Sequence, residues 1–299
     1  MRRLLLSASL ATAIVLAASS SAQAVVPCAI TPTASNVVTG QAALESITFD
    51  ERGRLLYTDR GRQALMVISK PGGAPKVLAK GIVDPGGIAL DGKGHAWVGF
   101  GNNITNATAP AKGAAGLVKV DLKTGRTSVA VRGLAMANGV VRTKSGEFFA
   151  SDDLAPSLDR VTAKGKVLPA WSSVAPTNGL ALSADGRYLY ANESLSPTRV
   201  VKIDVRNPAK VTAVATPPEA DAGAFLDGLT LGAKDRPYVA AWVAGEVWSG
   251  DGKGGFCKLA SGLKQPSAVA FGRKGSGFDT KSLYVTTYGG SVVRLAKAR

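Results

Sequence analysis

Short apolar segments separated by glycine-containing turns follow one another along most of the chain. The stretch 178–193 shows the unit clearly. Leu180 and Leu182 alternate with small residues, an Asp-Gly pair follows at 185–186, and the apolar run 188–190 comes next. Alternation of this kind predicts a half-buried strand, and glycine provides the positive φ that a tight hairpin turn requires. The stretch is therefore predicted to be a strand, a turn and a second strand.

The same unit occurs six times in the sequence. Successive copies are about 40 to 50 residues apart, which is the period of a β-propeller with one four-stranded blade per repeat. The chain also lacks a long segment with the 3.6-residue apolar period of a helix. We therefore predict an all-β fold, a six-bladed β-propeller. Its inner strands begin at Glu45, Gly86, Asn138, Asn178, Asp227 and Ser267.

The first 24 residues have the pattern of a secretory signal peptide. Residues 1–3 are positively charged, residues 4–19 are mostly apolar, and the small-x-small sequence at 22–24 is typical of a cleavage site. An uncleaved membrane anchor is the alternative, although the apolar run is short for a span of about 20 residues. We expect cleavage after Ala24, a single domain formed by residues 25–299, no membrane span, and a secreted, periplasmic or extracellular location.

The balance of charges is strongly basic. The whole chain carries +15, which becomes +13 (15 − 2) without Arg2 and Arg3. Nucleic-acid-binding domains are often this basic, but here the Lys and Arg residues are scattered singly, without interleaved aromatic residues. We therefore expect no nucleic-acid partner and favour electrostatic association with anionic cell surfaces. We expect a monomer with a small-molecule partner.

The ends of the chain predict how the ring of blades closes. The sixth blade has only three predicted strands, at 269–271, 283–286 and 292–295, whereas the segment 29–39 precedes the first blade and belongs to none. Adding this segment as an outer strand would complete the sixth blade and remove an exposed sheet edge. The propeller is therefore predicted to be closed by an N-terminal strand.

The sequence contains two cysteines, Cys28 and Cys257. Cys257 falls on the predicted outermost strand of the fifth blade, and Cys28 directly precedes the closing segment. An even number of cysteines in an exported protein favours a disulfide. We predict a Cys28–Cys257 disulfide at the rim, and two free thiols are the alternative.

Four of the inner strands begin with oxygen-bearing side chains, where a propeller places them around the top of its central channel. They are the carboxylates of Glu45 and Asp227 and the amides of Asn138 and Asn178. Such a cluster is costly to bury without compensation. A donor set without Cys or His suits a hard cation, Ca²⁺ best, with Mg²⁺ and Mn²⁺ as other candidates. The alternative is that the Asn-Gly and Asp-Gly pairs are only turn residues.

These segments resemble the senescence marker protein/gluconolactonase family, also called the regucalcin family, of six-bladed metal-dependent lactonases. The resemblance extends over residues 36–299 and rests on four motifs in the family's order, at Leu44–Asp50, Ala137–Val141, Thr177–Gly186 and Leu226–Thr230. It implies one divalent cation, Ca²⁺ or another such as Mg²⁺, Mn²⁺ or Zn²⁺, held by Glu45, Asn138, Asn178 and Asp227. It also implies that Asp227 is the catalytic general base and that Asn138 is a ligand or a substrate-binding residue.

The resemblance is incomplete in two respects. The family often carries an arginine that holds sugar hydroxyls shortly before the first Asn motif, but Arg132 lies too far before Asn138 for this assignment. The motif around Asn138 therefore does not imply that the substrate is a sugar lactone. Paraoxonase-like relatives use a His pair, whereas the one histidine, His95, lies in a predicted turn at the bottom face. A G-x-G-x-x-G match at 250–255 is not followed by a helix and is interpreted as a hairpin turn.

The loops on the predicted top face carry further groups. The longest, residues 101–116, is a lid candidate and contains glycosylation-type sequons at Asn103 and Asn106. Other top-loop residues, each interpreted as ordinary loop polarity, are Asp59, Asp152, Asp153, Glu193, Trp242 and Tyr288.

Two classes of function remain open. The first is a secreted metal-dependent hydrolase, a lactonase or related carboxylic ester hydrolase with the cation in the central channel. The second is a non-catalytic secreted propeller that binds a ligand or a cell-envelope partner. Strictosidine-synthase-like propellers share the Glu-Ser sequence that starts at Glu45 and are a further alternative.

Overall fold

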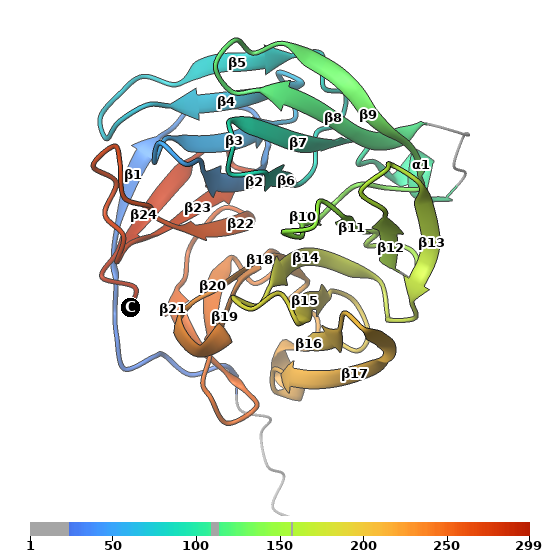
Figure 1. Ribbon diagram of the computed structural model, residues 1–299. Coiled ribbons are helices and arrows are strands. Elements are labelled where there is room, and N and C mark those ends of the chain that lie inside the picture. Colours follow the sequence, from blue (N-terminus) through green and yellow to red (C-terminus); the bar gives the residue numbers. More distant parts are fainter. Residues whose placement is uncertain (1–23, 109–113, 157) are drawn as a thin grey trace, which may run out of the picture.

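The computed structural model describes residues 24–108, 114–156 and 158–299. These residues form six four-stranded antiparallel sheets arranged in a ring (Figure 1). In the first five sheets the strands follow one another in chain order from the inside of the ring to the outside. The predicted six-bladed β-propeller is thus confirmed.

The first three blades follow the N-terminal segment. Blade 1 contains β2 (Leu44–Phe49), β3 (Leu55–Asp59), β4 (Ala64–Ile68) and β5 (Lys76–Lys80). Blade 2 contains β6 (Ile88–Leu90), β7 (His95–Phe100), β8 (Ala115–Asp121) and β9 (Thr127–Leu134), with the short helix α1 (Ile104–Thr108) between β7 and β8. Blade 3 contains β10 (Val140–Arg142), β11 (Phe148–Ser151), β12 (Leu158–Val161) and β13 (Val167–Ser172).

The last three blades complete the ring. Blade 4 contains β14 (Thr177–Leu182), β15 (Tyr188–Glu193), β16 (Arg199–Asp204) and β17 (Asn207–Ala215). Blade 5 contains β18 (Leu226–Leu231), β19 (Pro237–Ala241), β20 (Glu246–Gly250) and β21 (Phe256–Ala260). Blade 6 contains β22 (Pro266–Phe271), β23 (Leu283–Thr287), β24 (Val292–Ala296) and β1 (Thr33–Val38). Two short 3₁₀ helices, η1 (Glu219–Asp221) and η2 (Ala233–Asp235), flank β18.

The core lies between neighbouring blades. Successive side chains of a strand point to opposite faces of its sheet. In β3, Leu55 and Tyr57 pack in a cluster with residues of blade 6, whereas Leu56 packs in a cluster with residues of blade 2. Because both faces are covered, all five residues of β3 are buried. This explains why the second strand of a repeat is a continuous apolar run rather than an alternating one.

The N-terminal strand closes the ring as predicted. β1 pairs antiparallel with β24, with Ala34 opposite Leu295. It supplies the outer strand that blade 6 lacks, although it spans Thr33–Val38 rather than the whole predicted segment 29–39. Figure 1 shows the N-terminal segment running past blade 5 before it reaches blade 6.

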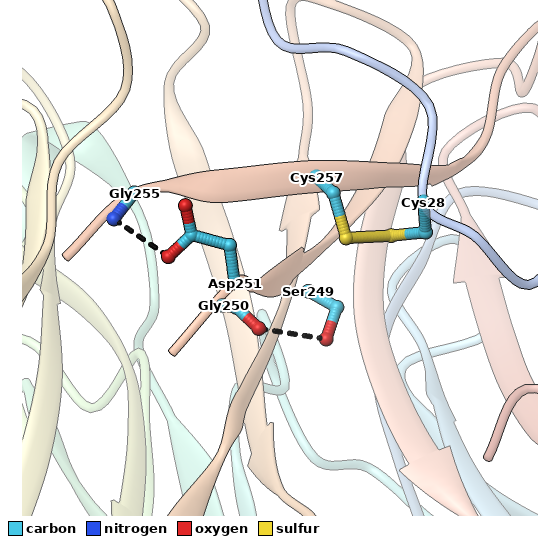
Figure 2. Close-up of a disulfide and its surroundings, with 6 residues drawn as sticks. All are labelled: Cys28, Ser249, Gly250, Asp251, Gly255 and Cys257. Atoms are coloured by element: carbon cyan, nitrogen blue, oxygen red, sulfur yellow. Dashed lines mark hydrogen bonds between the residues drawn. A yellow bond between two sulfur atoms is a disulfide. The ribbon is translucent and has the colours of Figure 1, made fainter. Parts of the chain in front are cut away.

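The predicted disulfide is present. Cys28 and Cys257 have bonded sulfurs 2.04 Å apart, and Figure 2 shows the bond joining the N-terminal segment to β21. Backbone hydrogen bonds support it, because Lys258 donates to the carbonyl of Val26 and accepts from the amide of Cys28, both at 2.8 Å. The N-terminal segment is therefore attached to blade 5 before it pairs with blade 6.

The predicted signal peptide, residues 1–24, lies outside the described residues except for Ala24. Across the described ranges, no helix has both the length and the apolar character that a membrane crossing requires.

Candidate functional site

Three of the four predicted site residues lie in β-bulges near the start of inner strands. In β2 the register shifts between Leu44 and Ile47, so that Glu45 and the residue after it stand opposite a single residue of β3. The same shift occurs around Asn178 in β14 and around Asp227 in β18. A bulge bends a strand and changes the direction of its side chains, and bulges are frequent next to active sites.

The glycines of the Asn-Gly and Asp-Gly pairs serve close packing rather than turns. A Cβ added to Gly139 would lie 2.3 Å from the carbonyl oxygen of Asn178, and one added to Gly179 would lie 2.4 Å from the backbone nitrogen of Leu229. Neither glycine has a positive φ. These residues are glycine because neighbouring inner strands approach closely. The interpretation as turn residues is wrong for the pairs at 178–179 and 227–228, which lie within β14 and β18, whereas Asn138 and Gly139 lie in the bend before β10.

The four predicted residues meet at the boundary between two cavities. A channel cavity of about 250 Å³ lies between the inner strands, and a second cavity of about 350 Å³, here called the upper cavity, is walled by the top loops. Both are lined by Glu45, Asn138, Asn178 and Asp227, each at most 6% exposed. The volume of the upper cavity is within the usual range for small-molecule sites.

The other two inner-strand positions add no donor to this set. Ser267 lines only the channel cavity, and its hydroxyl donates a hydrogen bond to the carbonyl of Leu44 at 2.7 Å. Gly86 has no side chain. The sequence thus identified a group of four oxygen-bearing residues that the fold brings together.

Glu45 is held by two donors from the top loops. The hydroxyl of Tyr288 donates a hydrogen bond to Oε2 of Glu45, and Nη1 of Arg60 lies 3.4 Å from the same oxygen. Arg60 also reaches Asp84, with Nη2 3.8 Å from Oδ1. Burial raises the pKa of Glu45 above its ordinary value, and the positive charge of Arg60 opposes this shift.

Asp227 and Asp153 carry further negative charge in the same space. Burial raises the pKa of Asp227 well above its ordinary value, and the charges of Glu45 and Asp153 add to the increase. Burial, followed by the charge of Glu45, raises the pKa of Asp153 to about 6. The Oδ1 atom of Asp153 is buried without a hydrogen-bond partner. Glu45, Asp153 and Asp227 together carry more negative charge than the single positive charge of Arg60 can offset.

The donor chemistry of this cluster fits a hard divalent cation. Carboxylate and amide oxygens are the ligands that Ca²⁺ takes in proteins. Burial raises the pKa of both Glu45 and Asp227, so a positive charge beside them would stabilise their ionised forms. Within the described ranges, no group of three or more His, Cys, Asp or Glu residues has a metal-binding arrangement. The four-residue cluster is not such a group, because two of its four donors, Asn138 and Asn178, are amides.

The top-loop residues fall into two groups. Asp153, Trp242 and Tyr288 line the upper cavity, so their interpretation as ordinary loop polarity is wrong. The other three have hydrogen-bond partners in their own loops or strands and do not line it. Asp59 pairs with Arg62, Asp152 accepts from the amide of Leu154, and Glu193 pairs with Arg199.

Several cavity residues were missed by the sequence analysis. Arg60, Asn102, Met136, Leu154 and Phe225 line the upper cavity. Arg60 directly follows Asp59, the last residue of β3, so its position offered a signal. The predicted long loop begins at the cavity with Asn102, Asn103 and Ile104 and includes α1; its residues 109–113 lie outside the described ranges.

Three further sequence features lie away from the site. Arg132 is on the outer strand β9, and its guanidinium carbon lies 5.7 Å from the centre of the Phe100 ring. His95 begins β7 and contacts Asp91, with Nδ1 2.9 Å from Oδ2. The glycine-rich segment 250–255 joins β20 to β21, and the amide of Gly255 donates to the Asp251 carboxylate (Figure 2). It is a hairpin turn, as predicted.

Comparison with protein families gives one match. A family model described as the SMP-30/gluconolactonase/LRE-like region matches residues 43–289. Among curated protein sequences, none matches the chain significantly.

Solved structures share the fold at low sequence identity. A gluconolactonase from Xanthomonas campestris superposes with a TM-score of 0.72 at 16% identity, over 92% of this chain and 98% of the other. A calcium-binding protein, regucalcin, from Agrobacterium tumefaciens gives 0.68 at 18% identity, over 91% and 95%. A virginiamycin B lyase from Staphylococcus aureus gives 0.61 at 13% identity, over 88% and 98%. At these identities the similarity establishes the fold.

Proposed function

This chain belongs to the SMP-30/gluconolactonase/LRE-like family, and we propose that it is a metal-dependent lactonase that hydrolyses a cyclic ester in the upper cavity. The observation that carries the proposal is the meeting of two carboxylates and two amides, all nearly fully buried, beside a ligand-sized cavity. Among the described residues that line this cavity, Arg60 is the only cation. The similarity to a gluconolactonase and to a calcium-binding regucalcin supports the proposal.

The cation in this proposal is Ca²⁺ or another divalent ion such as Mg²⁺, Mn²⁺ or Zn²⁺. Glu45, Asn178 and Asp227 would hold it, with Asn138 as a further ligand or as a contact to the substrate. When bound, it would polarise the lactone carbonyl and lower the energy of the negative charge that develops on the carbonyl oxygen. Tyr288 and Arg60 orient Glu45 through its Oε2 atom.

Asp227 is the residue proposed to move the proton. Unlike the amides of Asn138 and Asn178, its carboxylate can accept a proton. A water molecule attacks the carbonyl carbon while Asp227 takes up a proton from that water. A new C–O bond forms in this step. The ring C–O bond then breaks, the ring oxygen receives the proton, and a hydroxy acid leaves.

Hydrolysis of lactones with and without a chelator tests this proposal. The protein is incubated with γ-lactones, δ-lactones, sugar lactones and aryl esters, first as purified, then after EDTA treatment, and then with Ca²⁺ restored. We expect chelation to reduce turnover by about 100-fold or more, because Lewis-acid stabilisation is worth several kcal/mol. Added Ca²⁺ should restore activity, and elemental analysis should find about one equivalent per chain.

Two results would contradict the proposal. Full turnover by protein shown to be metal-free would remove the cation from the mechanism. Failure to hydrolyse every lactone and ester, with a ligand still bound in the upper cavity, would favour a non-catalytic or a strictosidine-synthase-like propeller.

A further inference from the structure

One part of the wall of the upper cavity is apolar, which is unusual for a site that would hold a polyhydroxylated sugar. This part is formed by Met136, Phe225 and Trp242, with Ile104 and Leu154 as further lining residues. A sugar lactone carries several hydroxyl groups, and each loses free energy when it is buried without a hydrogen-bond partner. We propose that the substrate is a neutral lactone or ester with an apolar alkyl or aryl substituent. This inference rests on the proposed function.

Three aromatic rings form a continuous side of the cavity. Phe225 and Trp242 have ring centres 6.0 Å apart, and Trp242 and Tyr288 have ring centres 5.8 Å apart, both in edge-to-face geometry. Rings in this arrangement support one another and offer a large apolar surface with few rotatable bonds. Because Tyr288 also donates to Glu45, the aromatic side begins directly at the proposed cation ligands.

The segments that carry Phe225 and Trp242 are joined through their backbones. Phe225 has a φ of +52°, a region that bulky residues rarely adopt. Its carbonyl accepts a hydrogen bond from the amide of Trp242 at 2.9 Å, which joins the two segments that carry the rings. A conformation of this kind is strained, and strained residues are frequent at functional sites.

The cavity also has apolar residues that remain accessible to solvent. Ile104 is 65% exposed and Leu154 is 40% exposed. The carboxylate of Asp152 holds the loop at Leu154, because its Oδ1 atom accepts from the amides of Leu154 and Ala155 at 2.9 and 3.1 Å. These exposed apolar side chains could contact the part of an alkyl or aryl substituent that extends out of the upper cavity.

Two polar residues on the wall of the upper cavity, Arg60 and Asn103, already have carboxylate partners. Arg60 contacts Glu45 and Asp84. Asn103 donates to Asp84 at 2.7 Å. These groups are engaged with carboxylates rather than available for sugar hydroxyls.

A homologous series of γ-lactones tests the inference. The 4-alkyl chain is lengthened from methyl to heptyl, and kcat/KM is compared with that for glucono-δ-lactone. We expect kcat/KM to rise about three- to fourfold for each methylene until the cavity is filled, as expected for burial of a methylene group. Preference for the sugar lactone, or the same kcat/KM across the series, would overturn the inference while leaving the lactonase proposal intact.

Two variants locate the apolar subsite. Trp242→Ala should reduce the advantage of the heptyl over the methyl lactone by about tenfold or more, while activity on the methyl lactone changes less. Trp97→Ala is the matched control, because Trp97 lies in a separate groove lined by residues such as Arg142 and Phe148. Equal effects of the two variants on the chain-length dependence would contradict the assignment.

A binding measurement separates this inference from the proposed catalysis. 5-Alkyl-2-pyrrolidinones have the shape of the γ-lactones but contain a stable amide, and their binding can be followed by tryptophan fluorescence. If no lactone is hydrolysed but affinity increases with alkyl length, the proposed function fails and the apolar ligand class is upheld. Affinity without dependence on alkyl length would overturn the inference.

A separate observation concerns Val25, the residue after the expected cleavage site. Val25 is 4% exposed and packs in the cluster between blades 4 and 5 with Tyr190 and Leu226. Its backbone nitrogen lies 2.6 Å from Oδ2 of Asp221 in η1. We infer that cleavage after Ala24 converts this nitrogen into an ammonium group paired with Asp221. Processing would then strengthen the attachment of the N-terminal segment, because an attraction between two opposite charges replaces the bond from a neutral amide to the same carboxylate.

This second inference is tested with two forms of the protein, one beginning at Val25 and one with a Gly-Ser-Ala extension before it. Asp221→Asn should lower the folding equilibrium constant about fivefold more in the form that begins at Val25. Glu219→Gln, on the same 3₁₀ helix, is the matched control and should lower it equally in both forms. An equal effect of Asp221→Asn in both forms, or a processed protein that begins at another residue, would overturn the inference.

Discussion

Replacing Asp227 with Asn is expected to reduce lactone turnover by about 100-fold or more, the usual contribution of a positioned general base. The substitution keeps the size of the side chain and one oxygen ligand, but an amide cannot accept the proton from the attacking water. It also removes a buried negative charge, and burial raises the pKa of this carboxyl in the intact site. The folded state should therefore tolerate the change well. The measurement is kcat on the best lactone at saturating cation.

Weaker cation binding is the main competing explanation for such a loss. Cation content must therefore be measured in the same samples, and kcat compared at full occupancy. Asp153→Asn is the matched control, because it removes a neighbouring carboxyl that also lines the upper cavity. We expect a smaller loss of kcat for this control. Wild-type turnover by Asp227→Asn at full occupancy would show that Asp227 is not the base.

Loss of the Cys28–Cys257 disulfide is expected to lower the free energy of unfolding by about 2–5 kcal/mol. The bond joins residues 229 positions apart, so it restricts nearly the whole unfolded chain. It also anchors the segment that precedes β1, which completes blade 6. The measurement is the denaturant midpoint of Cys28→Ser/Cys257→Ser compared with that of the oxidised protein.

Reduction of the wild-type protein provides the control, since it removes the bond without changing the side-chain volumes. Both forms should lose similar stability, and hydrogen exchange should show β1 as the first strand to open. Equal midpoints for the double variant and the oxidised protein would contradict the expected role. Detection of two free thiols in protein purified without a reductant would show that the bond does not form.

The repeating pattern of the sequence determined most of the fold. Six similar units with a regular period can bury their apolar strands only by packing side by side, and a ring leaves no blade uncovered. The missing outer strand of blade 6 likewise followed from counting strands. The four oxygen-bearing site residues were found for the same reason: they occupy equivalent positions in equivalent repeats, so symmetry brings them together.

The surroundings of those four residues were decided only by the tertiary structure. Tyr288 donates to Glu45 across 243 positions of sequence, and Val25 reaches Asp221 across 196. Local pattern carries no information on such pairs. Adjacent residues at the end of β3 also differ in their surroundings. Asp59 pairs with Arg62, whereas Arg60 lines the upper cavity. In a strand, successive side chains point to opposite faces of the sheet, so the repeat pattern predicts the direction of each one. In the loops, packing against other blades sets that direction.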